Sequence, residues 1–323
     1  MKRKVIFRAD ASRKIGYGHF VRSLALADML KDDFDCIFYT QEPTSYQREQ
    51  VLDVCQLVEL PAGESKFPLF LDVLNGDEIV VLDNFYYTLE YQQQIKAKGC
   101  KLVCMGGPDR QYAADLILSQ AATDSSLFHS LPGTQYCLGL EWALLRRPFT
   151  QYIPKKRERV QPRSAVICFG GTDYNNLTGQ TVDALCKDNL LDALDIIVGD
   201  VYEGHIDVRY TSKVTIHRNL SAQQIVNLFD KNDIAILASS SIAIEAMACR
   251  IPVIAGWWVD NQDAFYHLLE RNKFILGLGY LLTDSFGDNL KKALFNVSSF
   301  DYSNPISNAK QIPSRFVKVF HNL

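Results

Sequence analysis

The stretch that decides the fold is Lys4–Arg22, which reads KVIFRADASRKIGYGHFVR. It opens on a short apolar run that is typical of a buried strand, and from His19 onward apolar residues recur at helical spacing. A loop with two glycines, Gly16 and Gly18, separates the two patterns. A strand, a glycine loop and a helix in this order begin a βαβ unit, and ligands of such units bind beyond the carboxyl ends of the strands.

The same alternation of short apolar runs and helical-period segments continues along the chain. In the first half it predicts strands at 4–8, 35–39, 78–82, 101–105 and 116–118, with helices at 19–30 and 88–98. In the second half it predicts strands at 164–169, 194–198, 233–237 and 252–255, with helices at 177–187, 221–230, 240–249 and 261–271. The pattern therefore predicts two α/β domains, each with a parallel sheet covered by helices.

A proline-rich, basic stretch interrupts the alternation. It contains Pro148, Pro154 and Pro162 and is nearly all charge from Lys155 to Arg159. Such a composition favours a solvated connector. We therefore expect a first domain at 1–147, a linker at 148–163 and a second domain at 164–323, whose last helix could cross back onto the first domain.

Composition excludes several classes of protein. The 323 residues are 47% hydrophobic and 22% charged, which excludes a disordered chain, a collagen and a coiled coil. The formal net charge of −3 argues against a nucleic-acid partner, which normally meets a basic face. The longest apolar runs are too short for a membrane span or a signal-peptide core, so we expect no stable membrane insertion. Eight scattered cysteines, mostly in apolar runs, favour buried thiols in a reducing cytoplasm.

Candidate chemistry in the first domain lies in the opening loop. Glycines at 16 and 18 let the backbone approach a ligand, and the following helix directs free N–H groups at the same place. His19 stands at the helix start, and imidazole is a common acid–base catalyst. The alternative is a plain turn in which His19 has no catalytic role. The loop lacks the third glycine of the dinucleotide fingerprint and the lysine of a P-loop, which disfavours NAD and ATP.

Three loops of the second domain repeat this arrangement of strand, polar loop and helix. Each carries glycines, hydroxyls, amides or carboxylates that could line a cleft, or that could simply cap the following helix. The residues concerned are Gly170, Gly171, Thr172 and Asp173 in the first loop, Ser240, Ser241 and Glu245 in the second, and Asn261 and Gln262 in the third.

Together these segments resemble the GT-B fold, in which two Rossmann-like domains with parallel sheets face an interdomain cleft. More narrowly, the chain resembles the UDP-2,4-diacetamido-2,4,6-trideoxy-β-L-altropyranose hydrolases of the pseudaminic acid pathway, relatives of the glycosyltransferase that makes lipid II. The motifs that carry this likeness, in family order, are Arg8-x-Asp10-x-Ser12-x-x-Ile15-Gly16-x-Gly18-His19-x-x-Arg22, Leu138-Gly139-x-x-Trp142-Ala143-Leu144-Leu145-Arg146, Gly170-Gly171-Thr172-Asp173-x-x-Asn176, Ser240-Ser241-x-x-x-Glu245 and Asn261-Gln262.

The resemblance implies a hydrolase that releases UDP and a free sugar without a metal ion or cofactor. It implies that His19 positions or deprotonates the attacking water, that the first domain contacts the sugar, and that the second domain holds UDP. The substrate contacts implied in this way are Asp10, Ser12, Gly16, Gly18, Arg22, Asp83, Tyr86, Gly170, Gly171, Thr172, Ser240, Ser241, Glu245, Asn261 and Gln262.

Two segments depart from the family pattern. Where the family usually has Asp-His-Tyr, this chain has Asp83-Asn84-Phe85, with Tyr86 one residue later as a candidate replacement. Where the family usually has paired aspartates, it has Gly106-Gly107. These changes leave the sugar open. They also leave two rival functions: a GT-B glycosyltransferase that uses a UDP-sugar donor, and a nucleotide-sugar binding protein with little catalytic power.

Overall fold

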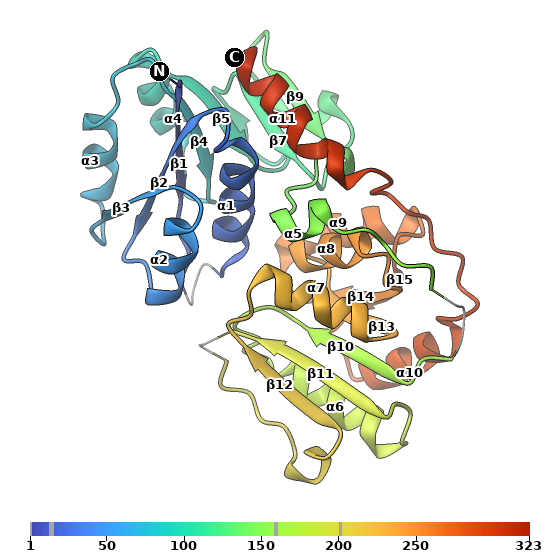
Figure 1. The fold of residues 1–323 in the computed structure, drawn as a ribbon. Coiled ribbons are helices and arrows are strands. Elements are labelled where there is room, and N and C mark those ends of the chain that lie inside the picture. Colours follow the sequence, from blue (N-terminus) through green and yellow to red (C-terminus); the bar gives the residue numbers. More distant parts are fainter. Residues whose placement is uncertain (1, 13–15, 158–160, 200–201) are drawn as a thin grey trace. The chain divides into compact units, whose positions relative to one another are not determined.

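The structure is a computed structural model that describes residues 2–12, 16–157, 161–199 and 202–323. The chain divides into two compact units, which we call unit 1 (Met1–Arg147 with Lys310–Leu323) and unit 2 (Pro148–Ala309). Each unit is built on one parallel sheet with helices packed against it (Figure 1). The predicted α/β class with parallel sheets is therefore confirmed.

The sheet of unit 1 has the strand order β3-β2-β1-β4-β5-β7-β9. Its strands are β1 (Lys4–Ala9), β2 (Asp35–Gln41), β3 (Gln56–Leu60), β4 (Ile79–Asp83), β5 (Lys101–Met105), β7 (Leu116–Ser119) and β9 (Gln135–Leu138). The chain runs outward from β1 to β3 and then returns to build the other half from β4. The point where the strand order reverses therefore lies between β1 and β4, and this is where open α/β sheets bind ligands.

The helices of unit 1 connect these strands. They are α1 (Gly18–Leu30), α2 (Ser45–Leu52), α3 (Lys66–Asp72), α4 (Leu89–Ala97) and α11 (Ile312–His321). The C-terminal α11 packs on α1. Its buried Phe316 and Phe320 contact Trp142 and Phe34, respectively. A separate two-stranded ribbon pairs β6 (Gln111–Tyr112) with β8 (His129–Ser130).

Unit 2 repeats the architecture with the strand order β12-β11-β10-β13-β14-β15. Its strands are β10 (Ser164–Cys168), β11 (Ala193–Val198), β12 (Val214–Arg218), β13 (Ile234–Ala238), β14 (Val253–Trp257) and β15 (Leu276–Tyr280). Its helices are α5 (Arg147–Gln151, which begins at the unit boundary), α6 (Leu177–Lys187), α7 (Ala222–Lys231), α8 (Ser241–Ala248), α9 (Asp260–Arg271) and α10 (Phe286–Asn296). Here the strand order reverses between β10 and β13.

The stretch predicted as a solvated linker differs from that expectation in part. It begins with α5, in which Phe149 is fully buried. Further along, Arg157 donates hydrogen bonds to the backbone carbonyls of Phe229 and Asn232, and Lys155 pairs with Asp230. These basic side chains meet the carboxyl end of α7, where cations are favoured by the helix dipole. The basic side chains of this stretch therefore hold it against unit 2.

No helix within the described residues is long and apolar enough to cross a membrane. All eight cysteines lie in the described ranges, and they form no disulfide bond.

Candidate active site

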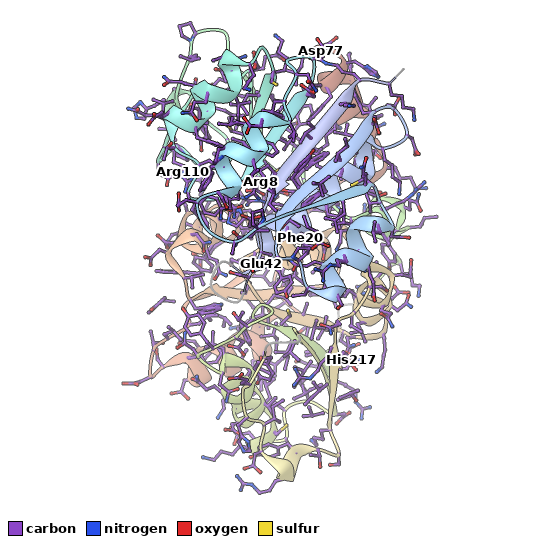
Figure 2. The ribbon with its side chains drawn as sticks, turned by 90° about the vertical axis from the view of Figure 1, so that its left-hand side faces the viewer. Arg8, Phe20, Glu42, Asp77, Arg110 and His217 are labelled. Carbon is purple, nitrogen blue, oxygen red and sulfur yellow. The ribbon has the colours of Figure 1, made fainter. Side chains whose placement is uncertain are left out.

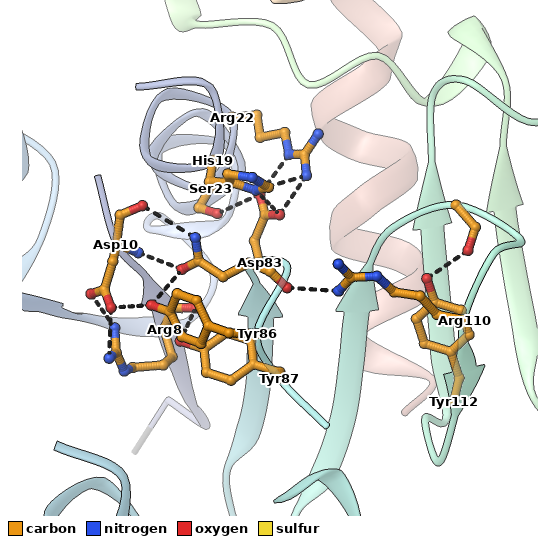
Figure 3. Close-up of polar contacts among 12 residues, drawn as sticks. Arg8, Asp10, His19, Arg22, Ser23, Asp83, Tyr86, Tyr87, Arg110 and Tyr112 are labelled. Atoms are coloured by element: carbon orange, nitrogen blue, oxygen red, sulfur yellow. Dashed lines mark hydrogen bonds and ion pairs between the residues drawn. The ribbon is translucent and has the colours of Figure 1, made fainter. Parts of the chain in front are cut away.

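In unit 1 the site lies where the strand order reverses. Strands β1 and β4 are parallel neighbours, and their register pairs Ala9 with Asp83. The loops that follow these strands therefore start side by side, at Asp10 and at Asn84. Helix α1 begins close to the same edge and contributes His19 from its first turn. Residues far apart in sequence are brought together in this way, as Figure 3 shows.

Asp83 is the centre of the first polar cluster. Its carboxylate is fully buried, and Oδ1 lies 2.7 Å from Nδ1 of His19. The Arg22 guanidinium donates to both carboxylate oxygens, and Ser23 Oγ donates to Oδ2 at 3.2 Å (Figure 3). Both oxygens of Asp83 are therefore occupied by side chains of α1.

The charge state of Asp83 determines which nitrogen of His19 carries the proton. Burial by itself raises the pKa of Asp83, but the charges of Arg22 and His19 and the hydrogen bonds from both side chains together lower the pKa to about 2. An ionised carboxylate can only accept hydrogen bonds. The 2.7 Å contact therefore requires a hydrogen on Nδ1 of His19. The Arg22 Nη2 atom is farther from Nδ1, at 3.1 Å, and has Asp83 as its acceptor.

With the proton on Nδ1, the neutral imidazole has a lone pair on Nε2. No described residue forms a hydrogen bond with that nitrogen, although the side chain is only 7% exposed. The ring of Phe85 stands edge-on against the imidazole, with the centroids 4.4 Å apart, and Phe85 itself is 51% exposed. This arrangement leaves Nε2 able to accept a proton in a site bordered by an apolar ring.

A second cluster surrounds Asp10. Arg8, fully buried within unit 1 (Figure 2), forms a two-pronged ion pair with the Asp10 carboxylate. The Tyr86 hydroxyl donates to the same carboxylate, and Asn84 Oδ1 accepts from the backbone N–H of Asp10 at 2.7 Å. Lys66 Nζ lies 3.5 Å from Asp10 Oδ2. Burial raises the pKa of Asp10, but the hydrogen bonds and charge of Arg8, together with hydrogen bonds from Tyr86 and the backbone of Gln41, hold the pKa below its usual value.

These contacts change the interpretation of four predicted substrate ligands. Asp10 and Asp83 are buried and already engaged, so the geometry favours positioning roles for both. The Tyr86 hydroxyl is used by Asp10 and lies 3.0 Å from Asn84 Oδ1, so it is not free to replace the tyrosine of the family pattern. The Arg22 guanidinium is likewise engaged, because it donates hydrogen bonds to Asp83.

The residues of the opening loop that were predicted to approach a ligand lie near the protein surface. Ser12 and Gly16 form a backbone bridge, with Gly16 N–H donating to Ser12 O at 2.8 Å. Gly16 has φ of 82°, and an added Cβ at Gly16 or Gly18 would meet no atom within 4 Å. The motif residue Ile15 lies outside the described residues. Helix α1 starts after Tyr17, which supplies no side-chain cap to its N-terminus.

In unit 2 some residues of the first predicted loop cap the following helix, and others remain available to line a cleft. Gly170 adopts φ of 108°, with open space where a Cβ would lie. Asp173 is buried and accepts from the backbone N–H groups of Leu177 and Thr178, while Asn176 caps α6 through Gly179 N–H. Asp173 and Asn176 are thus helix caps. Gly171 and Thr172 remain half-buried beside them.

The other two loops of unit 2 begin helices without side-chain caps. Helix α8 follows Ser240, whose side chain forms no cap hydrogen bond, and helix α9 follows Val259. Ser240 and Ser241 are half-buried and Asn261 is exposed. The side chain of Gln262 turns back to accept from Trp258 N–H at 3.2 Å.

Glu245 is only 3% exposed within α8, which leaves its carboxylate little access to sugar hydroxyls. No group of three or more His, Cys, Asp or Glu side chains in the described ranges is arranged to hold a metal ion.

Three residues of the unit 1 site are not among the candidates that the sequence indicates. Asn84 stands out in the sequence only as a departure from the family pattern, yet its side chain joins the two loops. Lys66 lies in α3 and Arg110 beyond β5, where Arg110 donates to the carbonyl oxygen of Asn84 at 2.9 Å (Figure 3). Only the loop position of Arg110, after a strand of the same parallel sheet, could have indicated it.

The fold defines a class of protein. Three solved structures match the chain over nearly its whole length: the glycotransferase of kitacinnamycin (TM-score 0.62, 11% identity, 99% of this chain and 98% of that one), MurG of Acinetobacter baumannii (0.60, 12%, 100% and 100%) and HepE of Anabaena in complex with UDP-glucose (0.60, 11%, 99% and 100%). The chain has the two-domain GT-B fold, as the sequence predicted.

Among curated proteins, the chain is similar to the UDP-2,4-diacetamido-2,4,6-trideoxy-β-L-altropyranose hydrolase of Campylobacter jejuni. The two are 24% identical over 81% of this chain and 94% of that protein. The chain is also 23% identical to an uncharacterized protein of Methanocaldococcus jannaschii, over 81% of this chain and 57% of that protein. No protein-family model matches the chain.

Proposed function

We propose that the chain hydrolyses a UDP-linked 2,4-diacetamido-2,4,6-trideoxy sugar to UDP and the free sugar, in the synthesis of a pseudaminic acid or related surface glycan. The observation that carries this proposal is the His19–Asp83 pair, in which Asp83 holds Nδ1 and leaves Nε2 to act as a base. The similarity to the Campylobacter jejuni hydrolase over most of the chain supports the choice of reaction and sugar.

In the proposed reaction, Nε2 of His19 accepts a proton from water as the water oxygen attacks the anomeric carbon. The bond between that carbon and the oxygen of the UDP β-phosphate breaks, and UDP leaves with the electron pair. His19 becomes an imidazolium, and the buried Asp83 carboxylate stabilises the new charge across the 2.7 Å contact. Arg22 holds Asp83 in place and keeps it ionised.

Unit 2 would bind the nucleotide. The N-termini of α8 and α9 have no side-chain caps, so their backbone N–H groups can donate hydrogen bonds to phosphate oxygens. Gly170, Gly171 and Thr172 follow β10, and the strand order of unit 2 reverses between β10 and its neighbour β13. Helix α6 is less suited to this role because Asn176 and Asp173 already cap it.

Transfer of the sugar to an acceptor is the second candidate. Structures named as glycosyltransferases share this fold, and the same base could deprotonate an acceptor hydroxyl in place of water. The similarity to a named hydrolase favours water as the acceptor.

The test is turnover of a panel of UDP-linked diacetamido sugars, with UDP and free sugar followed by NMR. We expect equal amounts of both products, and a loss of about 10²- to 10⁴-fold in kcat for His19→Ala. His217→Ala is the matched control, because His217 also pairs with a buried aspartate, Asp195. UDP release without free sugar would favour transfer, and an unchanged rate in His19→Ala would remove His19 from the mechanism.

A further inference from the structure

The loop after β5, which begins with the altered Gly106-Gly107 segment, contacts the altered Asn84-Phe85 segment beside His19 through Arg110. Arg110, from the loop after β5, donates from Nη1 to the carbonyl oxygen of Asn84 at 2.9 Å. Its guanidinium also lies over the ring of Phe85, 5.2 Å from the centroid, and that ring in turn stands against His19. Figure 3 shows Arg110 reaching from the loop after β5 toward the loop that follows β4. Arg110 and Phe85 therefore form one surface beside His19.

This surface combines the apolar ring of Phe85 with N–H groups of Arg110 that can still donate hydrogen bonds. Phe85 is 51% exposed, although large apolar side chains usually avoid water. The Arg110 side chain is 25% exposed, and its ion-pair partner among the described residues is Asp109, at 4.0 Å and 77% exposed. Arg22 and Arg8, by contrast, form close ion pairs with buried carboxylates. A guanidinium has five N–H donors, so Arg110 can still bind an oxygen acceptor.

We propose that Phe85 and Arg110 together bind an acylamino substituent of the sugar. The methyl group of an acetamido substituent would pack on the Phe85 ring, and its carbonyl oxygen would accept a hydrogen bond from Arg110. The chemistry of the two side chains matches the two ends of this one group. The inference rests on the proposed function, because it places the sugar next to Nε2 of His19.

The charge of Arg110 makes this recognition selective. A sugar that carries a free amine at the same position is an ammonium ion at neutral pH and would be repelled by the guanidinium. It also has no methyl group for Phe85. The subsite therefore accepts the acetylated sugar and rejects its amino counterpart.

The experiment compares the UDP-linked diacetamido sugar with its two amino analogues, in each of which one acetamido group is replaced by an amine. For Arg110→Gln we expect kcat/KM on the diacetamido sugar to fall about tenfold, as for loss of one charge-assisted hydrogen bond. We expect activity to rise on the analogue whose amine replaces the bound acetamido group. Arg110→Lys keeps the charge and loses the planar fork, so it should still reject the amine.

Phe85→Ser should lose activity on the diacetamido sugar and retain rejection of the amine, because the repelling charge remains. Arg48→Gln is the matched control, since Arg48 pairs with Glu59 on the surface of unit 1. This variant should leave kcat/KM unchanged on every substrate. Equal effects of Arg110→Gln on the diacetamido sugar and both amino analogues would overturn the subsite while leaving hydrolysis intact. Absence of UDP release from every sugar by the parent protein would instead overturn the proposed function.

Discussion

Asp83 in unit 1 and Asp195 in unit 2 are both buried aspartates that hold one histidine and one cation. Asp83 binds His19 and Arg22, and Asp195 binds His217 and Lys231. The histidine nitrogens differ. His19 uses Nδ1, whereas His217 uses Nε2 and lies on β12 at the edge of its sheet. Only the first pair stands at a point where the strand order reverses, which is why we assign chemistry to it alone.

Asp83→Asn should lower kcat by about 10²- to 10⁴-fold with little change in KM. The neutral amide can donate to Nδ1, which would move the imidazole proton to Nε2 and remove the base. Asp195→Asn is the matched control and should lower the melting temperature without changing kcat per folded molecule. Steady-state kinetics with thermal melts of both variants check this. A comparable fall in kcat for Asp195→Asn would mean that the loss reports on folding.

The same carboxyl predicts how stability depends on pH. The pKa of Asp83 falls from 3.8 to about 2 in the folded chain, because Arg22 and His19 outweigh burial. A lowered pKa stabilises the fold above the unfolded value, and the contribution is lost as the pH falls toward 2. The difference in unfolding free energy between the parent and Asp83→Asn should therefore shrink by about 1 kcal/mol between pH 5 and pH 3. Denaturant titrations of both proteins measure it, and a constant difference would show that the Asp83 pKa is not lowered.

The sequence predicted the central strands of both sheets and failed at their edges. Strands such as β1 and β13 are buried on both faces, so they appear as continuous apolar runs. Strand β3 reads QLVEL and is buried fully only at Leu60, and the connecting α2 has little apolar character. Such elements are stabilised mainly by packing against neighbouring elements, so their own sequence pattern does not reveal them.

The site was predicted in outline only. The loop after β1 and the position of His19 followed from the order of strands and helices, whereas Asp83 and the loop after β4 were implied only by the family resemblance. What sequence spacing could not show is that Asp83 lies beneath His19, since 64 positions separate them. Nor could it show that Asn84 and Arg110 meet, because that contact depends on the register of β4 and β5. The assignment of sugar to unit 1 and UDP to unit 2 stays a prediction.

Tyr86→Phe should reduce stability more than activity. The Tyr86 hydroxyl donates to the buried Asp10 carboxylate, so its loss should cost about 1–3 kcal/mol of unfolding free energy. We expect KM for the sugar nucleotide to change less than about threefold, because this hydroxyl is not available to the substrate. Tyr91→Phe is the control, since its hydroxyl donates to a neutral carbonyl at 3.3 Å. A tenfold rise in KM with unchanged stability would restore Tyr86 as a sugar ligand.

Ser240→Asp should affect stability and nucleotide binding in opposite directions. Ser240 precedes α8 without capping it, and an aspartate there can accept from the free N–H groups and complement the helix dipole. The melting temperature should therefore rise or hold. If α8 binds the diphosphate, the added negative charge should weaken UDP binding at least about tenfold, as measured by calorimetry. Ser221→Asp is the matched control, because Ser221 already caps α7 and the variant retains a capping oxygen. Unchanged UDP affinity in Ser240→Asp would place the phosphates elsewhere, since a carboxylate at a helix N-terminus competes with any anion bound there.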